Sequence, residues 1–132
     1  MISISECTLF PPITCTVKEK ISSAAKKLKK NSVRHLYVID NKKKLLGIFS
    51  AVDVINKIIA EGKDYRKLSV KNVMKTDIVS FKKTDSLTAA FGFMSQTSVF
   101  SVPIVENNKL IGVLTYKDVM TTIMKKKQSM KK

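Results

Sequence analysis

Several residue types are scarce in this chain of 132 residues, and each shortage excludes a class of protein. There are two cysteines, Cys7 and Cys15, and one histidine, His35, so a zinc site built from Cys and His ligands has no support. A disulfide is not expected in a reducing compartment, and we interpret both cysteines as ordinary thiols. No apolar run approaches the roughly 18 to 20 residues that cross a bilayer. The amino terminus lacks the basic start and long apolar stretch of a secretory signal, so we expect a cytoplasmic protein with no membrane partner.

Groupings of catalytic residues are also missing. No Cys or Ser forms a recognisable nucleophilic pair with the single histidine, and there is no metal-ligand cluster. The four glycines do not form a phosphate loop of the GxxxxGK type. We therefore predict a protein that is not an enzyme and needs no obligatory cofactor.

Acidic residues are few relative to basic ones. Lys and Arg together number 25 and Asp and Glu together 10, giving a net charge of +15, yet only Arg34 and Arg66 are arginines. Such a charge attracts anions, including nucleotides, nucleic acids and acidic partners. A solvated lysine coat, of compositional origin or as a heavily charged thermophile-type surface, is the favoured interpretation of the charge, and a specific role in binding polyanions is the alternative. The scarcity of arginine and of aromatic residues, which make up 7% of the chain, argues against sequence-specific reading of nucleic acid.

What the chain does contain is an internal duplication. Residues 44–54 (KLLGIFSAVDV) recur as residues 109–119 (KLIGVLTYKDV), at an offset of 65 residues. Upstream, residues 32–41 match residues 98–107 in the same order. Two copies of about 60 residues therefore fill the chain, and each is expected to form one supersecondary unit.

Each copy has the pattern strand, helix, strand, strand, helix. The predicted strands are 14–17, 36–39 and 45–49 in the first copy, and 78–81, 102–105 and 110–114 in the second. The first helix of each copy is predicted from apolar residues at helical spacing, namely Ile21, Ala24, Ala25 and Leu28, and Leu87, Ala90, Phe91 and Met94. The closing helices are predicted to bury Val54, Ile55, Ile58 and Ile59, and Val119, Met120, Ile123 and Met124. The predicted fold class is α/β, in the manner of an α+β sandwich, with two tandem repeats related by pseudo-two-fold symmetry.

The repeats define the expected domain boundaries. Repeat 1 spans residues 1–62, a linker spans 63–69, repeat 2 spans 70–124, and residues 125–132 are expected to be a disordered basic tail. One copy alone would bury too little apolar surface to be comfortably stable, so the copies are expected to pack on their sheets.

A Gly-h-h-Ser/Thr-x-x-Asp motif, in which h is apolar, lies at a predicted strand-to-helix junction in each copy. It supplies Ser50 and Asp53 in the first copy and Thr115 and Asp118 in the second. Amide groups at a helix start favour a phosphate, and a carboxylate can accept hydrogen bonds from a ribose diol. The same residues can act as a helix cap worth about 0.5 to 2 kcal/mol. The two roles are compatible, and both remain open at this point.

The duplicated pattern resembles the CBS domain, named for cystathionine beta-synthase, which occurs in pairs called Bateman modules. That family couples the motif to an apolar strand of the type h-Pro-h-h-Asp, and residues 102–106 and 112–119 fit this arrangement closely. The first copy has Tyr37 in place of the proline, and residues 70–80 resemble the family's opening segment. The resemblance covers residues 8–124.

The resemblance implies an adenosine-containing regulatory ligand, such as AMP, ADP, ATP or S-adenosylmethionine, in a cleft between the repeats. Asp53 and Asp118 are expected to hold the ribose, and Ser50 and Thr115 to face the phosphate. The other expected ligand contacts are Ile78, Val79, Val102 and Pro103 in one base pocket, Ile13, Thr14, Leu36 and Tyr37 in the other, and the phosphate contacts Arg34, His35 and Lys117.

The two copies differ in ways that predict one good site instead of two equal ones. The second copy has Phe100 and Ser101 where the first has Arg34 and His35, so it lacks that cationic pair. His35 can alternatively be a surface residue at a strand edge. The first copy is also expected to be two residues shorter between its first strand and its first helix.

The resemblance implies a non-catalytic regulatory module. Ligand binding would change its conformation and alter its contact with an effector protein that the sequence does not identify. A homodimer formed by the packing of CBS pairs is also expected. The alternative function is nucleic-acid binding through the lysine-rich surface, driven by the phosphate backbone and strongly salt-dependent.

Overall fold

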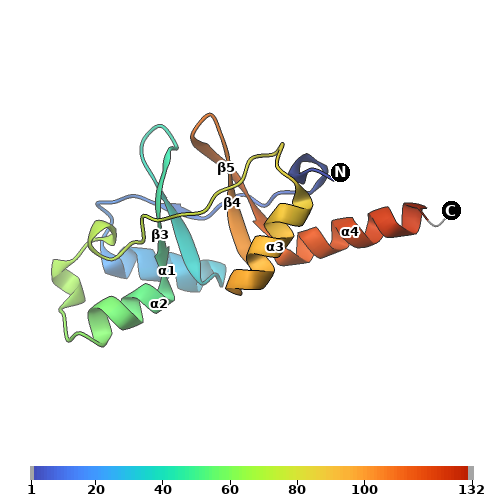
Figure 1. Cartoon of the computed structure of the whole chain (residues 1–132). Coiled ribbons are helices and arrows are strands. Elements are labelled where there is room, and N and C mark those ends of the chain that lie inside the picture. Colours follow the sequence, from blue (N-terminus) through green and yellow to red (C-terminus); the bar gives the residue numbers. More distant parts are fainter. Residues whose placement is uncertain (1, 131–132) are drawn as a thin grey trace. The chain divides into compact units, whose positions relative to one another are not determined.

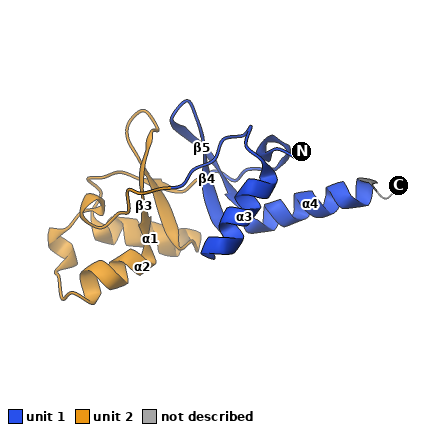
Figure 2. Cartoon of the chain, viewed as in Figure 1, with its two compact units in different colours: residues 1–11, 79–132 blue, residues 12–78 orange. Residues whose placement is uncertain are grey.

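The computed structural model of the chain describes residues 2–130 and divides into two compact units. Unit 1 combines Met1–Pro11 with Val79–Lys132, and unit 2 is the continuous segment Pro12–Ile78 (Figure 2). Unit 1 is therefore built from both ends of the chain. The predicted α/β class is confirmed, since each unit combines helices with a small sheet (Figure 1).

Unit 2 contains a three-stranded sheet with the order β1-β2-β3. Its elements are β1 (Thr14–Cys15), α1 (Ile21–Asn31), β2 (His35–Ile39), β3 (Leu45–Ser50), α2 (Ala51–Val54), the π-helical segment η2 (Ile55–Ile59), and the short 3-10 helices η3 (Tyr65–Lys67) and η4 (Val70–Asn72). Strand β1 runs parallel to β2, and β2 runs antiparallel to β3. This is the predicted order of strand, helix, strand, strand and helix.

Unit 1 has a helix, two strands and a closing helix in the same order as unit 2, preceded by a 3-10 helix at the start of the chain. These elements are the 3-10 helix η1 (Ile4–Glu6), α3 (Leu87–Thr97), β4 (Ser101–Glu106), β5 (Lys109–Thr115) and α4 (Tyr116–Met130). Strands β4 and β5 pair antiparallel, and Phe81 forms a parallel bridge to Ile104. The strand predicted at 78–81 is thus reduced to one bridge, because only the backbone of Phe81 pairs with β4, through Pro103 and Val105.

The opening segments of the two repeats are exchanged between the units. Phe10, from the start of the chain, bridges Val113 of β5, while Lys75, from the opening segment of the second repeat, bridges Ile48 of β3. The two bridging residues are 65 positions apart, the same offset that relates the motifs. Each compact unit therefore combines the main part of one sequence repeat with the opening segment of the other.

This exchange explains the glycine of each motif. A Cβ atom at Gly47 would lie 2.6 Å from the carbonyl oxygen of Lys75, and one at Gly112 would lie 2.9 Å from Cβ of Leu9. Real Cβ atoms do not approach other atoms so closely, so each sheet must carry glycine where the opening segment crosses it.

The first helices bury most of the predicted apolar stripe, but Ala25 is exposed and Phe91 is half-buried. Helix α1 buries Ile21, Ala24 and Leu28, and α3 buries Leu87, Ala90 and Met94. Each stripe packs into the apolar core of its own unit, together with residues of the sheet such as Val38 in unit 2 and Ile104 in unit 1. Burial of this apolar surface is the main stabilising contribution to each unit.

The register of the sheets corrects one expectation about the repeats. Cys15 opposes Val38 in the same way that Phe81 opposes Ile104, so Cys15 and Phe81 are equivalent. Both lie six residues before the first residue of a helix, Ile21 or Leu87. The first copy is therefore not shorter in this region.

The closing helices depart from the prediction in three places. Ile55 and Ile59 are 54% and 68% exposed, because no other element of unit 2 covers their side of the helix, and Met124 of α4 is likewise exposed. Helix α4 also continues through Met130, so residues 125–130 of the predicted disordered tail are helical. The good helix formers Lys125–Lys127 and Gln128 explain the extension, since no Gly or Pro ends the helix. Residues 131–132 lie outside the described residues.

Over residues 2–130, none of the helices has both the length and the apolar character that a membrane span requires.

Candidate functional site

In unit 2 the motif forms a reciprocal pair between a hydroxyl group and a carboxylate at the junction of β3 and α2. The backbone N–H of Asp53 donates to Oγ of Ser50 at 3.1 Å, and Ser50 Oγ donates to Oδ2 of Asp53 at 2.9 Å. Ser50 has an extended backbone, as an N-cap residue should. The capping role that the sequence left open is therefore realised.

Unit 1 repeats this geometry where β5 passes into α4. The N–H of Asp118 donates to Oγ1 of Thr115 at 3.2 Å, and Thr115 Oγ1 donates to Oδ2 of Asp118 at 2.7 Å. In each unit one carboxylate oxygen is thus held by the capping hydroxyl. The other oxygen, Oδ1, is the one that remains for a further partner or a ligand.

Around Oδ1 the two units differ. Asp53 is 3% exposed, and Nζ of Lys57, one helical turn further on, lies 3.5 Å from its Oδ1. Lys57 also donates to the carbonyl oxygen of Val73 at 2.9 Å. The position equivalent to Lys57, 65 residues later, is Thr122. Asp118 is only partly buried.

Asp118 lines a pocket with a volume of about 380 Å³, within the range of small-molecule sites. The pocket lies between the amino-terminal segment and one face of α4, and its lining residues are Glu6, Thr8, Asp118, Thr121, Thr122, Lys125, Lys126 and Ser129. Hydroxyl groups and charges of both signs dominate this lining. Such a surface suits the sugar and phosphate parts of a ligand better than an apolar ring.

Two contacts fix the wall of this pocket. Nζ of Lys126 lies 2.6 Å from Oε1 of Glu6, and this hydrogen bond, aided by one from the Ser3 amide, lowers the pKa of Glu6. The pKa of the Cys7 thiol, in the same amino-terminal segment, is raised chiefly by burial. The contact between Glu6 and Lys126 holds this segment against α4.

The predicted base-pocket residues of the first repeat lie together at the edge of the sheet in unit 2. Thr14 opposes Tyr37 in the β1–β2 pairing, and the N–H of Tyr37 donates to the carbonyl oxygen of Ile13 at 3.0 Å. Leu36 and Tyr37 are buried, and Leu36 belongs to the apolar core. The structure thus brings these four residues together.

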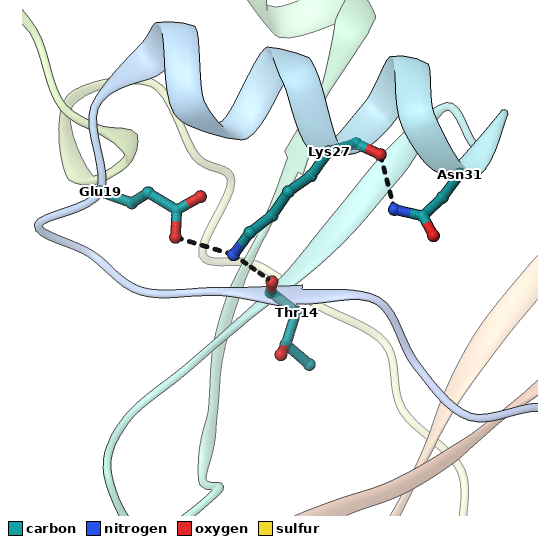
Figure 3. A network of polar contacts seen from close by, with 4 residues as sticks. All are labelled: Thr14, Glu19, Lys27 and Asn31. Atoms are coloured by element: carbon teal, nitrogen blue, oxygen red, sulfur yellow. Dashed lines mark hydrogen bonds and ion pairs between the residues drawn. The ribbon is translucent and has the colours of Figure 1, made fainter.

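Strand β1 is held on α1 by a polar network around Thr14 (Figure 3). Nζ of Lys27 donates to the carbonyl oxygen of Thr14 at 3.0 Å and to Oε1 of Glu19 at 2.9 Å. Oε2 of Glu19 is buried and has no hydrogen-bond partner among the described residues. The amide of Asn31 donates to the carbonyl oxygen of Lys27 at 2.8 Å (Figure 3).

Arg34 and His35, the predicted phosphate contacts, face different surroundings. Arg34 is exposed, whereas His35 is half-buried, with Nε2 3.0 Å from the hydroxyl of Tyr37 and the two rings in a T-shaped contact. Burial lowers the pKa of His35, so its imidazole is neutral at pH 7. Of these two side chains, Arg34 alone would therefore offer a positive charge to a phosphate.

The predicted contacts of the second repeat are distributed over both units. Val102 and Pro103 are buried in β4, and Val79 and Lys117 are exposed in unit 1. Ile78 is half-buried and belongs to unit 2. Of all predicted site residues, Asp118 alone lines the pocket described above.

Sequence reasoning missed the other residues of that pocket. Thr8 and Glu6 come from the far end of the chain, and nothing in the sequence shows that this segment joins the second repeat. Thr122 could have been found, because a residue four positions after Asp118 lies on the same helix face. In the described part of the chain, no three His, Cys, Asp or Glu side chains are grouped to hold a metal ion.

Comparison with known proteins settles the family. The family model described as "CBS domain" matches residues 4–60 and 70–125. The chain belongs to the CBS domain family. CBS domain pairs generally act as regulatory, non-catalytic modules.

One relative of comparable length is the CBS domain-containing protein YhcV of Bacillus subtilis, 27% identical over 94% of this chain and 87% of its own. A solved CBS domain pair of protein MJ0100, in complex with 5'-methylthioadenosine and S-adenosyl-L-methionine, is 25% identical with a TM-score of 0.76, covering 96% of this chain and 98% of its own. CBSX2 in complex with AMP is 21% identical, with a TM-score of 0.79 and 96% and 99% coverage, and supports the fold alone. The chain spans 61%, 21% and 38% of the length of the first three curated relatives that it matches.

Proposed function

We propose that this CBS domain pair is a regulatory module that binds an adenosine-containing ligand at Asp118 and is not itself an enzyme. The observation that carries the proposal is a carboxylate, oriented by Thr115 and partly open, that lines a polar pocket of about 380 Å³. Asp118 accepts hydrogen bonds from the ribose hydroxyls, and Thr115 positions it. Lys125 lines the pocket and Lys117 is exposed beside Asp118 in the chain, and both supply positive charge for the phosphate of a nucleotide ligand.

The ligand class is supported by the solved MJ0100 pair, whose ligands both contain adenosine. Pro103 is buried in β4, and the alternation of side chains along a strand places it on the face opposite to Val102 and Ile104, which belong to the apolar core of unit 1. We therefore retain Pro103 as the contact for adenine. AMP, ADP, ATP and S-adenosylmethionine share the ribose diol that Asp118 recognises.

We also propose that the module acts as a homodimer. Val52, Ile55 and Ile59 recur at helical spacing along α2 and η2 and are each more than half exposed. A contiguous apolar stripe on a folded unit is typical of a protein–protein contact. The nucleic-acid alternative is not retained, because no observation beyond the overall charge favours it.

Isothermal titration calorimetry with AMP, ATP and S-adenosylmethionine tests the proposal. We expect at least one of these ligands to bind saturably, and Asp118→Asn to weaken it about 10- to 100-fold, because hydrogen bonds to a charged acceptor are worth about 1.5 to 3 kcal/mol. The matched control is Asp53→Asn, which removes the same charge from the equivalent position of unit 2. We expect its affinity to stay within about threefold of the unsubstituted protein.

Ribose 5-phosphate serves as a ligand control that keeps the sugar and phosphate but lacks the base. Absence of binding by all three adenosine ligands would contradict the proposed function. Equal weakening by both Asp substitutions would contradict the assignment of the site to Asp118.

A further inference from the structure

Lys57 occupies the one oxygen of Asp53 that the capping hydroxyl leaves available. Its ammonium group lies 3.5 Å from Oδ1, while Ser50 holds Oδ2. The same ammonium donates to the carbonyl oxygen of Val73 at 2.9 Å, so the lysine is fixed at two points on different segments of unit 2. The Asp53 side chain is 4% exposed and that of Lys57 is 41% exposed. The lysine thus covers the carboxylate while its own stem remains at the surface.

Among the described residues of unit 1, the position equivalent to Lys57 does not carry a cation. Thr122 stands where Lys57 stands in unit 2, and it lines the pocket beside Asp118. Of the two lysines in the pocket, Lys126 is paired with Glu6 and Lys125 is exposed, and neither forms an ion pair with Asp118 among the described residues. Asp118 therefore faces a pocket, whereas the equivalent carboxylate faces an ammonium group of its own chain.

We infer that the ammonium group of Lys57 takes the place of a ligand at Asp53. It thereby blocks the ligand site of the first repeat and restricts the chain to one adenosine ligand, bound at Asp118. This inference rests on the proposed function. A ribose hydroxyl that donates to Oδ1 of Asp53 would have to displace an ammonium, and it would leave a positive charge against the Val73 carbonyl without its carboxylate. Exchange of a charged donor for a neutral one at a buried carboxylate is unfavourable. Lys57 is consequently a specificity-determining residue that selects between two otherwise similar motifs.

The inference predicts that removal of the ammonium opens a second site. The test is the number of ligands bound per chain, measured by calorimetry with the tightest of AMP, ATP and S-adenosylmethionine. We expect one ligand for the unsubstituted protein and a second, Asp53-dependent ligand for Lys57→Met and for Lys57→Thr, which copies unit 1. The second binding event should disappear in the double variant Lys57→Met with Asp53→Asn.

Two control variants distinguish the blocking of the Asp53 site by Lys57 from a general effect of lost positive charge or lost structure. Lys63→Met removes a lysine that pairs with Glu61 at the surface of the same unit and should leave one ligand bound. Lys57→Arg retains the cation and should also leave one. Circular dichroism melts establish which variants are folded. In the reciprocal variant, Thr122→Lys, the new ammonium should close unit 1 and weaken binding at least about 10-fold.

The outcomes distinguish this inference from the proposed function. Two ligands on the unsubstituted protein, one of them lost in Asp53→Asn, would overturn the inference and leave the proposed function intact. Folded Lys57→Met and Lys57→Thr that still bind one ligand would do the same, as would unchanged affinity in Thr122→Lys. Absence of binding by the unsubstituted protein and every variant would reject the proposed function, and the inference with it.

Discussion

Asp53 and Asp118 occupy the same position of a duplicated motif, and their capping contacts are nearly identical. Ser50 and Thr115 each accept a hydrogen bond from the backbone N–H of their aspartate and donate one to its Oδ2. The carboxylates nevertheless have different surroundings, since one is covered by Lys57 and the other lines a pocket. Similarity of a motif therefore does not imply similarity of a site, because a residue one helical turn away can change what the motif is able to bind.

The units also differ in how the opening strand is held against the first helix. In unit 2, Lys27 connects Thr14 and Glu19 through its ammonium group. In unit 1 the residue equivalent to Lys27 is Phe93, which packs edge-to-face on Phe81 with ring centroids 5.8 Å apart. A polar contact and an aromatic contact thus do the same structural task in the two units.

The largest contrast that we predict is in the reactivity of the two cysteines. Cys15 is buried in the core of unit 2, and burial raises its pKa to about 12, whereas Cys7 of unit 1 is only half-buried, although burial raises its pKa too. Because the thiolate is the reactive form, we expect Cys7 to react with a thiol reagent about 100-fold faster or more in the folded protein. Mass spectrometry of partly labelled protein locates the modified residue. Equal rates before unfolding would show that unit 2 opens readily.

The exchanged opening segments predict unequal costs for alanine at the two motif glycines. At Gly47 a new methyl group would meet the Lys75 carbonyl, which also accepts the hydrogen bond of the Ile48 amide, so we expect a loss of about 2 to 3 kcal/mol in unfolding free energy. At Gly112 it would meet Cβ of Leu9 at 2.9 Å, a less severe approach than the 2.6 Å at Gly47 and one that disturbs no hydrogen-bonded carbonyl, and we expect about 1 to 2 kcal/mol. Urea denaturation measures both. A harmless Gly47→Ala would contradict the close approach of the opening segment.

The polar network around Glu19 predicts a cost for the loss of Lys27. Lys27→Met removes the partner of Glu19, whose second oxygen is already buried without one, and we expect about 1 to 3 kcal/mol of destabilisation. Lys26, the exposed neighbour on the same helix, provides the control, and Lys26→Met should change the unfolding free energy by less than about 0.5 kcal/mol. Similar values for both variants in urea denaturation would mean that the network contributes only as a surface ion pair.

The smallest predicted effect is a pH dependence due to His35 of unit 2. Burial lowers the pKa of its imidazole in the folded state, so unfolding takes up a proton below the ordinary value of about 6.5. The stabilising contribution is fully present above this pH and is lost as pH falls through and below it. We expect the difference in Tm between the unsubstituted protein and His35→Gln to change between pH 7.5 and pH 5.5. A difference that stays constant over this range would contradict the lowered pKa.

The duplication accounts for how much could be predicted from the sequence. Paired strands, first helices and the junctions at Ser50 and Thr115 follow from local patterns that occur twice, and the structure contains all of them. The opening segments could not be assigned in this way. The pairing of Phe10 with Val113 joins residues far apart in sequence, and local spacing carries no information about such a contact.

The site could be predicted only in part for a related reason. Lysine four residues after an aspartate on a helix is typical of an exposed ion pair, so the spacing alone does not predict that Lys57 covers a buried carboxylate. Ile55 and Ile59 have the spacing of a buried stripe, yet they are exposed because burial depends on a covering element and not on periodicity.

The measurement that tests the central claim most directly is a titration of ¹⁵N-labelled protein with the tightest of the three adenosine ligands, followed by amide chemical shifts. The account predicts saturable shifts at residues 115–122, around Asp118 and Thr122, with little change at residues 50–57, around Asp53 and Lys57. Saturable shifts at 50–57 with none at 115–122 would contradict it, because the ligand would then occupy the repeat that Lys57 closes.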